Sequence, residues 1–179
     1  MALIVLLRGV TVGGHRVFRP SALAKQLQHL GAVNIGAAGT FVFTKPVTRT
    51  RLRAELARRL PFAAAAAVCD GREIIRLMSH EFFARSPATR DTVRWVSVLM
   101  RRPRKVPKLP RQFPSRGRWL VRVIACDGRF VLGEYRRDAR TIRHLGAPDA
   151  LFDVPGTIRN RNTMLAVAQV LGWHADGDA

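Results

Sequence analysis

The sequence predicts an α+β fold made of two ferredoxin-like subdomains of the βαββαβ type in tandem, the second of them degenerate. Two observations support this prediction. Short apolar runs alternate with leucine stripes of helical period through residues 2–69 in the order βαββαβ, and a second series of apolar runs follows from residue 92. A chain of 179 residues with 47% hydrophobic content can bury one core or two small ones. We therefore expect one subdomain at 1–90, with a glycine loop and a following helix, and another at 91–179, with a basic loop and a C-terminal helix.

Each element of the first half follows from a local pattern. The run at 2–8 is short and uniformly apolar, which is typical of a buried strand, and the leucines after it recur at helical spacing until Gly31 ends the helix. Pro61 ends the second helix because proline lacks a backbone N–H. The expected elements are a strand at 2–8, a helix with Leu23, Leu27 and Leu30, strands at 33–35 and 40–44, a helix with Leu52, Leu56 and Leu60, and a strand at 63–69 closed by the turn pair Asp70-Gly71.

The second half contains fewer regular patterns. Four prolines and eight basic residues fall within 101–118, so this segment is expected to be an exposed loop rather than a central strand or a long helix. The tetrapeptide Cys-Asp-Gly-Arg occurs at 69–72 and again at 126–129. The repeat hints at a duplication, but it is too short to prove one. The remaining expected elements are a helix at 72–83, a strand at 92–100, hairpin strands at 119–126 and 129–135 around Asp127-Gly128, and a helix at 163–171.

The chain is strongly basic, with 31 Lys and Arg against 12 Asp and Glu and a formal charge of +19. No acidic residue occurs in 1–54 or in 92–126. Two such blocks favour a face of positive potential that attracts nucleic acid or phosphorylated metabolites. The alternative is a solvated surface whose charge only keeps the protein in solution.

Several classes of protein are not indicated. Cys69 and Cys126 are far apart with no Cys or His at metal-ligand spacing, so we expect no disulfide framework, no metal site and no cofactor. No apolar run reaches the ~18 to 20 residues of a membrane-spanning helix, and the apolar start lacks the marks of a secretory signal. We therefore expect a cytoplasmic protein without a membrane partner; the oligomeric state stays open.

The loop at 8–16 is the first candidate binding site. Its glycines permit positive φ and close approach of a ligand to backbone N–H groups, and Arg8 adds positive charge. The spacing of Gly9 and Gly14 is that of a phosphate loop, but His15 and Arg16 stand where such a loop needs Lys and Ser or Thr. Anion binding and a purely structural turn therefore both stay open.

The segment 157–163 is the second candidate, because it is expected to open the last helix. Free backbone donors and the helix dipole favour an anion there, and Arg159 adds positive charge. Asn160 and Asn162 exceed what a single cap requires, although one cap with solvated arginines would also explain the pattern.

Three motifs of this chain resemble an uncharacterised, mainly bacterial family known as domain of unknown function 1697. They are Leu6-Leu7-Arg8-Gly9-Val10-Thr11-Val12-Gly13-Gly14, Ala38-Gly39-Thr40-Phe41-Val42-Phe43 and Thr157-Ile158-Arg159-Asn160-Arg161-Asn162-Thr163. The resemblance implies two ferredoxin-like subdomains and no established activity. The family usually has Asn at Thr11, Ser-Gly-Asn at 38–40, Lys near His15, Trp at Arg161, and a helix in place of the basic loop. These departures suggest that the ancestral ligand is altered or lost in this member.

The leading hypothesis is a non-enzymatic or weakly enzymatic protein that binds an anionic ligand, either a nucleotide-like metabolite or a nucleic-acid backbone. One alternative is an enzyme acting on a small phosphorylated substrate, with Glu134 or His15 transferring a proton. Another is a protein–protein interaction module whose basic loop, 101–118, docks an acidic partner. The candidate ligand-binding residues are Arg8, Gly9, Thr11, Gly13, Gly14, Gly39, Arg159, Asn160 and Asn162.

Overall fold

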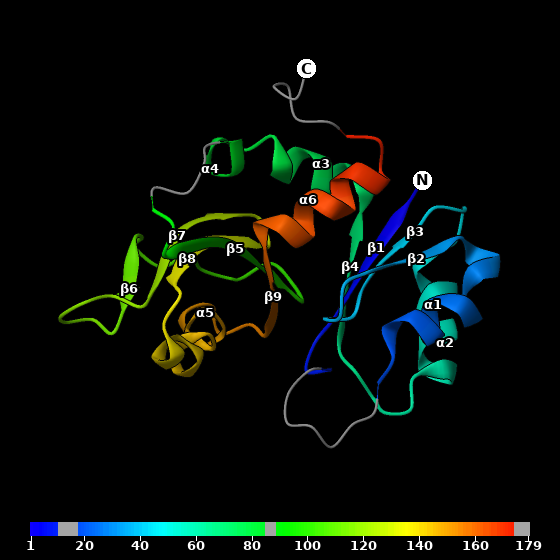
Figure 1. The fold of residues 1–179 in the computed structure, drawn as a ribbon, viewed down its shortest axis with the longest axis horizontal. Coiled ribbons are helices and arrows are strands. Elements are labelled where there is room, and N and C mark those ends of the chain that lie inside the picture. Colours follow the sequence, from blue (N-terminus) through cyan, green and yellow to red (C-terminus); the bar gives the residue numbers. More distant parts are fainter. Residues whose placement is uncertain (11–17, 85–88, 174–179) are drawn as a thin grey trace. The chain divides into compact units, whose positions relative to one another are not determined.

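The computed structural model describes residues 1–10, 18–84 and 89–173, and the chain divides into two compact units (Figure 1). The first unit comprises Met1–Met78 together with the C-terminal segment from Thr163, and the second comprises Ser79–Asn162. Each unit contains one antiparallel sheet. The expected combination of helices and strands is confirmed, whereas the units have different bounds from the subdomains predicted at 1–90 and 91–179.

The first unit contains the elements expected from its sequence. Its sheet has the order β2-β3-β1-β4, and each neighbouring pair is antiparallel. The elements are β1 (Leu3–Leu7), α1 (Pro20–Gln26), η1 (Gln28–Leu30), β2 (Ala32–Ile35), β3 (Thr40–Phe43), α2 (Arg49–Arg59), β4 (Ala66–Asp70), α3 (Gly71–Met78) and, from Thr163 onward, α6 (Arg161–Val170). The first two residues of α6, Arg161 and Asn162, belong to the second unit.

The core of the first unit explains why every residue of β1 is apolar. Leu3, Val5 and Leu7 belong to one apolar cluster with residues of α1 and α2, which lie on the same face of the sheet (Figure 1). Ile4 and Leu6 point to the opposite face, as successive residues of a strand must, and are fully buried as well. Because β1 is central and covered on both faces, neither face tolerates polar residues.

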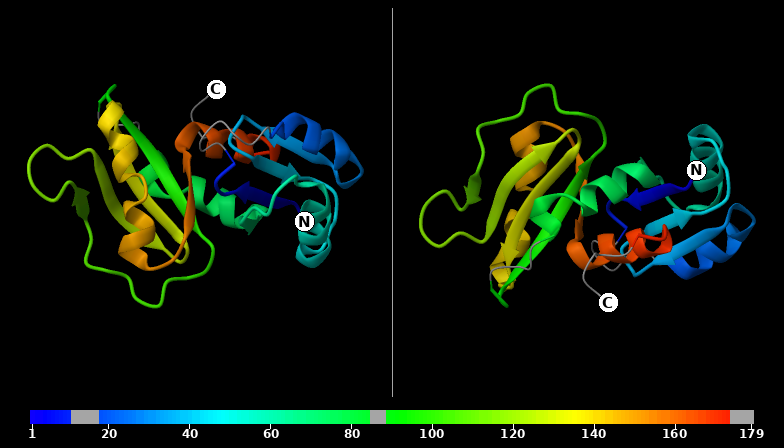
Figure 2. Two further views of the ribbon diagram at one scale, coloured as in Figure 1. Left: turned by 90° about the horizontal axis from the view of Figure 1, so that it is seen from below. Right: turned by 90° about the horizontal axis from the view of Figure 1, so that it is seen from above.

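The second unit is built around a five-stranded sheet of order β6-β7-β8-β5-β9. Helix α5 packs on one face of this sheet, where Phe152 joins an apolar cluster with Trp95 and Leu99 of β5 (Figure 2). The elements are α4 (Glu81–Ala84), β5 (Thr92–Leu99), β6 (Arg111–Phe113), β7 (Val121–Asp127), β8 (Phe130–Arg136), η2 (Ala139–His144), α5 (Ala147–Phe152) and β9 (Gly156–Asn160).

The structure corrects the expected helix start at 157–163. This segment begins as strand β9, which pairs antiparallel with β5 from Leu99↔Gly156 to Trp95↔Asn160, and α6 begins only at Arg161. The backbone of β9 is satisfied by the neighbouring strand β5, an interaction between distant segments that local propensity does not reveal. Elements β6, η2 and α5 were also not expected.

Two further boundaries differ from the sequence expectation. Asp70-Gly71 is not a turn, because β4 runs directly into α3, and the carboxylate of Glu73 accepts a hydrogen bond of 2.8 Å from the backbone N–H of Asp70. The single helix expected at 72–83 is divided into α3 and α4. Among the residues described, no helix has both the length and the apolar composition needed to cross a membrane.

Trp95 occupies the space above Gly133 in the core of the second unit. Trp95 is fully buried and lies directly opposite Gly133 in the pairing of β5 with β8. A Cβ atom at Gly133 would lie 2.3 Å from Cζ2 of Trp95 and 2.2 Å from the carbonyl oxygen of Arg122, far inside van der Waals contact. Only glycine therefore permits this packing.

We predict that Gly133→Ala destabilises the protein by about 2 kcal/mol or more, because the indole and the adjacent backbone must move. Urea unfolding measures this change. Gly146→Ala is the matched control in the same unit, since nothing lies within 4 Å of its added Cβ, and it should change the stability by less than about 0.5 kcal/mol. Equal stability of the two variants would contradict the packing described.

Candidate functional site

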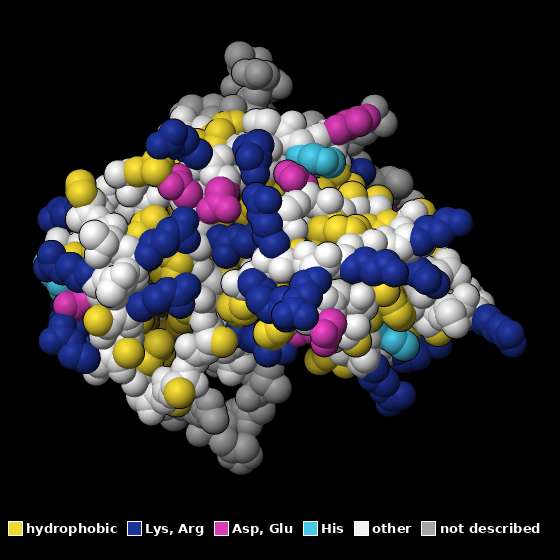
Figure 3. All heavy atoms as spheres, turned by 180° about the vertical axis from the view of Figure 1, so that it is seen from behind, with side chains coloured by type: hydrophobic (Ala, Val, Ile, Leu, Met, Phe, Trp, Pro, Cys, Tyr) yellow, Lys and Arg dark blue, Asp and Glu magenta, His cyan; other side chains and the backbone are white. Residues whose placement is uncertain are grey.

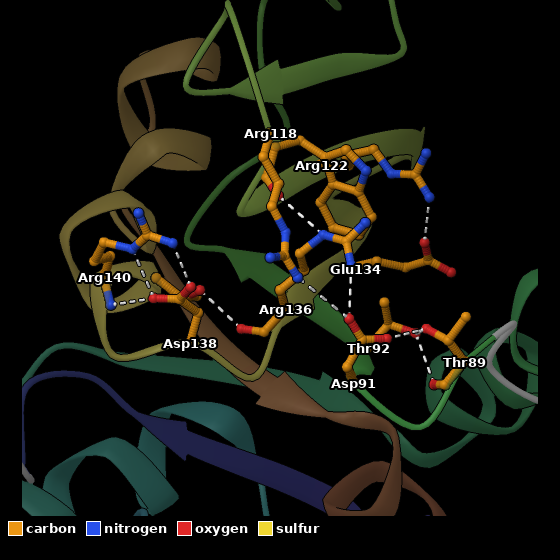
Figure 4. A network of polar contacts seen from close by, with 11 residues as sticks. Thr89, Asp91, Thr92, Arg118, Arg122, Glu134, Arg136, Asp138 and Arg140 are labelled. Carbon is orange, nitrogen blue, oxygen red and sulfur yellow. Dashed lines mark hydrogen bonds and ion pairs between the residues drawn. The ribbon is translucent and has the colours of Figure 1, made fainter.

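A row of charged side chains crosses the second sheet at the level of Glu134. In the strand register Glu134 of β8 lies opposite both Arg94 of β5 and Arg122 of β7. Nη2 of Arg122 donates to Oε2 of Glu134 at 2.8 Å (Figure 4), and Nε of Arg94 donates to Oε1 at 3.5 Å. Glu134 is 5% exposed and Arg94 is 9% exposed, so the row includes a buried ion pair.

The row continues toward the start of α6. Asn160, the last residue of β9, pairs with Trp95 of β5. Because the two strands are antiparallel, the next residue of the chain, Arg161, lies beside Arg94. Both guanidinium groups are held by carbonyl oxygens of α4: Nη1 of Arg94 donates to Phe82, and Nε of Arg161 donates to Phe83 at 2.9 Å. Carbonyls at a helix end lack partners within the helix, so they are natural acceptors for cations.

A cavity of about 120 Å³, here called the β9–α6 pocket, opens beside these arginines. Three guanidinium groups and two carboxamides contribute to its wall, and no carboxylate does among the residues that the structure describes. Such a wall is rich in hydrogen-bond donors and carries positive charge. The pocket is lined by Thr92, Val93, Arg94, Tyr135, Arg137, Asn160, Arg161 and Asn162.

The N-terminus of α6 reinforces this character. Residues Arg161 and Asn162 open a ten-residue helix whose first turn contains no acidic side chain. The first N–H groups of a helix have no partner within it, and the helix dipole places partial positive charge at this end. The pocket therefore combines side-chain donors with a helix terminus, both of which favour an anion.

A cluster of aromatic and charged groups fixes the neighbouring edge of β8 (Figure 4). The guanidinium carbons of Arg122 and Arg136 lie 4.0 and 4.2 Å from the ring centroid of Trp119, within the range of cation–π attraction. Nη1 of Arg136 also binds the carboxylate of Asp91 at 2.6 Å, and Thr89 donates its hydroxyl to the same carboxylate. The hydrogen bond from Thr89 and the contact with Arg136 hold the pKa of Asp91 below its usual value.

The structure separates the three residues that the sequence grouped near the last helix. Asn160 and Asn162 line the β9–α6 pocket, but Arg159 does not. Nη1 of Arg159 donates to Oγ1 of Thr157 at 2.8 Å and to the carbonyl of Ile158 at 2.7 Å. Burial lowers the pKa of Arg159 to about 10.

Sequence reasoning missed most of the cationic wall. Arg94 occupies a strand whose other residues are largely apolar, and an arginine inside such an apolar strand is a sequence signal that could have marked it. Arg137 and Tyr135 reach the pocket from β8 and the residue after it, and nothing local in the sequence indicates their proximity to Asn160.

Most of the predicted glycine-loop site cannot be placed beside these residues. Thr11, Gly13, Gly14 and His15 lie outside the described residues. Arg8 and Gly9 are exposed at the end of β1 in the first unit, and their convergence with the segment at 159–162 stays a prediction.

Gly39 has a structural role in the same unit. Its φ is +70°, and an added Cβ would lie 2.9 Å from Cγ2 of Val10 and 3.0 Å from Cβ of Leu7. Its carbonyl accepts the backbone N–H of Leu7 at 2.8 Å. The turn before β3 therefore needs glycine for its own packing.

The predicted proton-transfer group Glu134 is engaged in the charged row. Each of its carboxylate oxygens accepts a hydrogen bond from a different arginine, and it does not line the β9–α6 pocket. These two hydrogen bonds give Glu134 a structural role in the sheet.

Basic side chains are also spread widely over the surface. Figure 3 shows Lys and Arg across one whole face, with only scattered Asp and Glu. The charge excess therefore does not by itself select a site, and the pocket geometry has to do so.

Comparisons with known proteins identify a family and a fold. A family model described as "Protein of unknown function (DUF1697)" matches residues 1–116. The solved structure of the conserved bacterial protein SP0830 from Streptococcus pneumoniae is similar with a TM-score of 0.54 and 17% sequence identity, over 96% of this chain and 98% of that one. At this identity the likeness concerns the fold. No curated protein matches the chain.

We predict that Glu134→Gln destabilises the protein by about 3 kcal/mol, because it leaves the buried charge of Arg94 without its carboxylate. Urea unfolding at neutral pH measures the loss. The exposed Asp153→Asn serves as the control and should lie within about 0.5 kcal/mol of the wild type. A Glu134→Gln protein as stable as this control would show that the charged row does not support the sheet.

We further predict that Asp138 contributes to the loss of stability in acid. The side chain of Arg140 donates to both of its carboxylate oxygens, at 3.0 and 2.7 Å, and these bonds hold the pKa of Asp138 well below its usual 3.8. The stabilisation is complete above the ordinary pKa and disappears as the pH falls toward the lowered one. The melting temperature of Asp138→Asn should therefore fall less than that of the wild type between about pH 5 and about pH 2. Parallel pH profiles would contradict this.

Proposed function

Because the chain belongs to the DUF1697 family, which is described as one of unknown function, we propose its function from the chemistry of the β9–α6 pocket. The protein binds a small molecule through an anionic group, such as the phosphate of a metabolite. The observation that carries this proposal is the composition of the pocket wall: three arginines and two asparagines converge there, and none of the described residues of the wall is acidic.

The size of the pocket supports a single anionic group. Its volume of about 120 Å³ corresponds to roughly four water molecules at ~30 Å³ each. One phosphate or carboxylate fits such a space, while the rest of the ligand would lie outside. Guanidinium and carboxamide groups donate hydrogen bonds to oxyanions with good geometry, and charge-assisted bonds of this kind are among the strongest in proteins.

The anchoring of the arginines supports binding over an accidental gathering of charge. Arg94 is held by Glu134 and by α4, and Arg161 is held by α4, so neither guanidinium group has to be ordered when a ligand arrives. A preorganised donor loses less conformational entropy on binding. The pocket wall carries three arginines, and no carboxylate among its described residues offsets them, which leaves a net positive charge that an anion would neutralise.

We also infer that each unit is a ferredoxin-like plait. The first sheet has the order β2-β3-β1-β4, and the strands β7-β8-β5-β9 of the second sheet have the same order when they are numbered from β5. In both units the fourth strand runs directly into a helix, α3 after β4 and α6 after β9. The second unit lacks a helix between its first two plait strands, which agrees with a degenerate copy.

A cytoplasmic location fits this role. Cys69 is buried, Cys126 is half-buried, and both are free thiols. Unpaired cysteines are typical of reducing compartments, where phosphorylated metabolites are abundant.

We predict that Asn162→Asp weakens phosphate binding at least about tenfold, since a carboxylate in the pocket repels the anion and one donor is lost. An acidic residue in the first turn of α6 is compatible with the helix dipole, so folding should be preserved. Inorganic phosphate is titrated against the labelled protein, and shifts of the backbone amides of 160–163 are followed by NMR.

Gln169→Glu provides the control for this experiment. It adds the same negative charge at an exposed position on the same helix, outside the pocket. It should bind phosphate like the wild type. An equal loss of phosphate affinity in both variants would mean that only the net charge of the protein matters. Unchanged phosphate binding by Asn162→Asp would refute the proposed site.

A further inference from the structure

A second and larger cavity lies between the segment that connects β5 with β7 and the end of α5. Its volume is about 550 Å³, more than four times that of the β9–α6 pocket and within the range of small-molecule sites. We call it the basic cavity. It is lined by Arg101, Arg104, Lys105, Pro107, Lys108, Arg111, Leu151, Phe152 and Asp153.

Positive charge dominates the basic cavity. Over the described part of the lining, five cationic side chains face a single carboxylate, that of Asp153. In the part of the chain that the structure describes, Arg104, Lys105 and Lys108 form no ion pair and no side-chain hydrogen bond. Like charges that gather around a hollow repel one another, and a polyanion placed between them would remove that repulsion.

The wall of the cavity is anchored to the sheet. Leu109 and Phe113 pack against the apolar cluster that contains Trp95, and β6 pairs with β7. Nη2 of Arg101 donates to the carbonyl oxygen of Asp153 at 3.4 Å, which joins the first residue of the segment to the end of α5. The cations are therefore carried by a backbone that is fixed at several points.

The floor of the cavity argues for phosphate groups rather than nucleic-acid bases. Among the described residues of the lining Phe152 is the only aromatic one, and it is 4% exposed because it belongs to the core. Bases in single strands bind by stacking on exposed aromatic rings, and the lining offers none. The hollow also suits a compact ligand better than the convex surface of a duplex.

The topology explains how the hollow arises. In the first unit the connection from the first to the second strand of the sheet carries helix α1, whereas in the second unit the equivalent connection, from β5 to β7, has no helix among its residues. Prolines at 103, 107 and 110 prevent helix formation in this connection. In place of a helix, a loop rich in arginine and lysine borders the basic cavity.

We propose that the basic cavity binds a compact oligophosphate, a ligand with three or more linked phosphate groups. The site is distinct from the β9–α6 pocket, shares no lining residue with it and does not depend on the proposed function. Several linked phosphates match the number of cations and the volume, which a single phosphate would leave largely unfilled.

Calorimetric titration of the full chain with inorganic tripolyphosphate tests this inference. The wild type should bind tripolyphosphate much more tightly than inorganic phosphate, and added salt should weaken the binding. Lys105→Ala/Lys108→Ala should weaken it at least about tenfold, since two charge-assisted contacts are lost. Arg102→Ala/Arg116→Ala removes the same charge from exposed positions on the same segment outside the lining, and should retain most of the affinity.

The other outcomes overturn the proposal. Equal losses in the two double variants would mean general electrostatic attraction, and absence of binding to the wild type would remove the site. A short DNA duplex that binds more tightly than tripolyphosphate and depends on Lys105 and Lys108 would assign the cavity to nucleic acid. Asn162→Asp should keep the part of tripolyphosphate binding that depends on Lys105 and Lys108, so failure at one pocket is distinguishable from failure at the other.

Discussion

The second unit depends on one buried carboxylate. Glu134 lies between Arg94 and Arg122 on three adjacent strands, and removing such a group from water is costly unless cations compensate it. The ion pairs orient Arg94, whose guanidinium group then reaches the end of α4 and the wall of the β9–α6 pocket. A structural requirement of the sheet thus places positive charge where a helix begins, and the proposal of anion binding rests on this charge.

The fold could be predicted wherever local pattern and tertiary pairing agree. The apolar run of β1, the leucine stripes and the Asp127-Gly128 hairpin are all present. They could be predicted because the spacing of apolar residues and the residue types of a turn are properties of a short stretch of sequence. Strand β9 was missed, since its short sequence is extended only through pairing with β5. The repeated tetrapeptide Cys-Asp-Gly-Arg lies at a strand–helix junction in one unit and at a hairpin turn in the other, so it does not mark equivalent positions.

The candidate site was predictable only in part. Asn160 and Asn162 were identified because two carboxamides near a helix start exceed the needs of a cap, and both line the pocket. Arg94 belongs to β5 and Arg137 follows the end of β8, and no spacing rule relates them to the asparagines. Arg159 has the expected chemistry, but the alternation of strand β9 directs it to the buried face beside Thr157.

The central claim is that the start of α6 and the arginines beside it receive an anion. A crystal of the wild-type protein soaked in tungstate, a heavy tetrahedral oxyanion, tests it most directly. We expect an anomalous peak within hydrogen-bonding distance of the Asn162 side chain and of Arg94 or Arg137. Tungstate bound at other surface arginines, with the β9–α6 pocket left to water, would contradict the account.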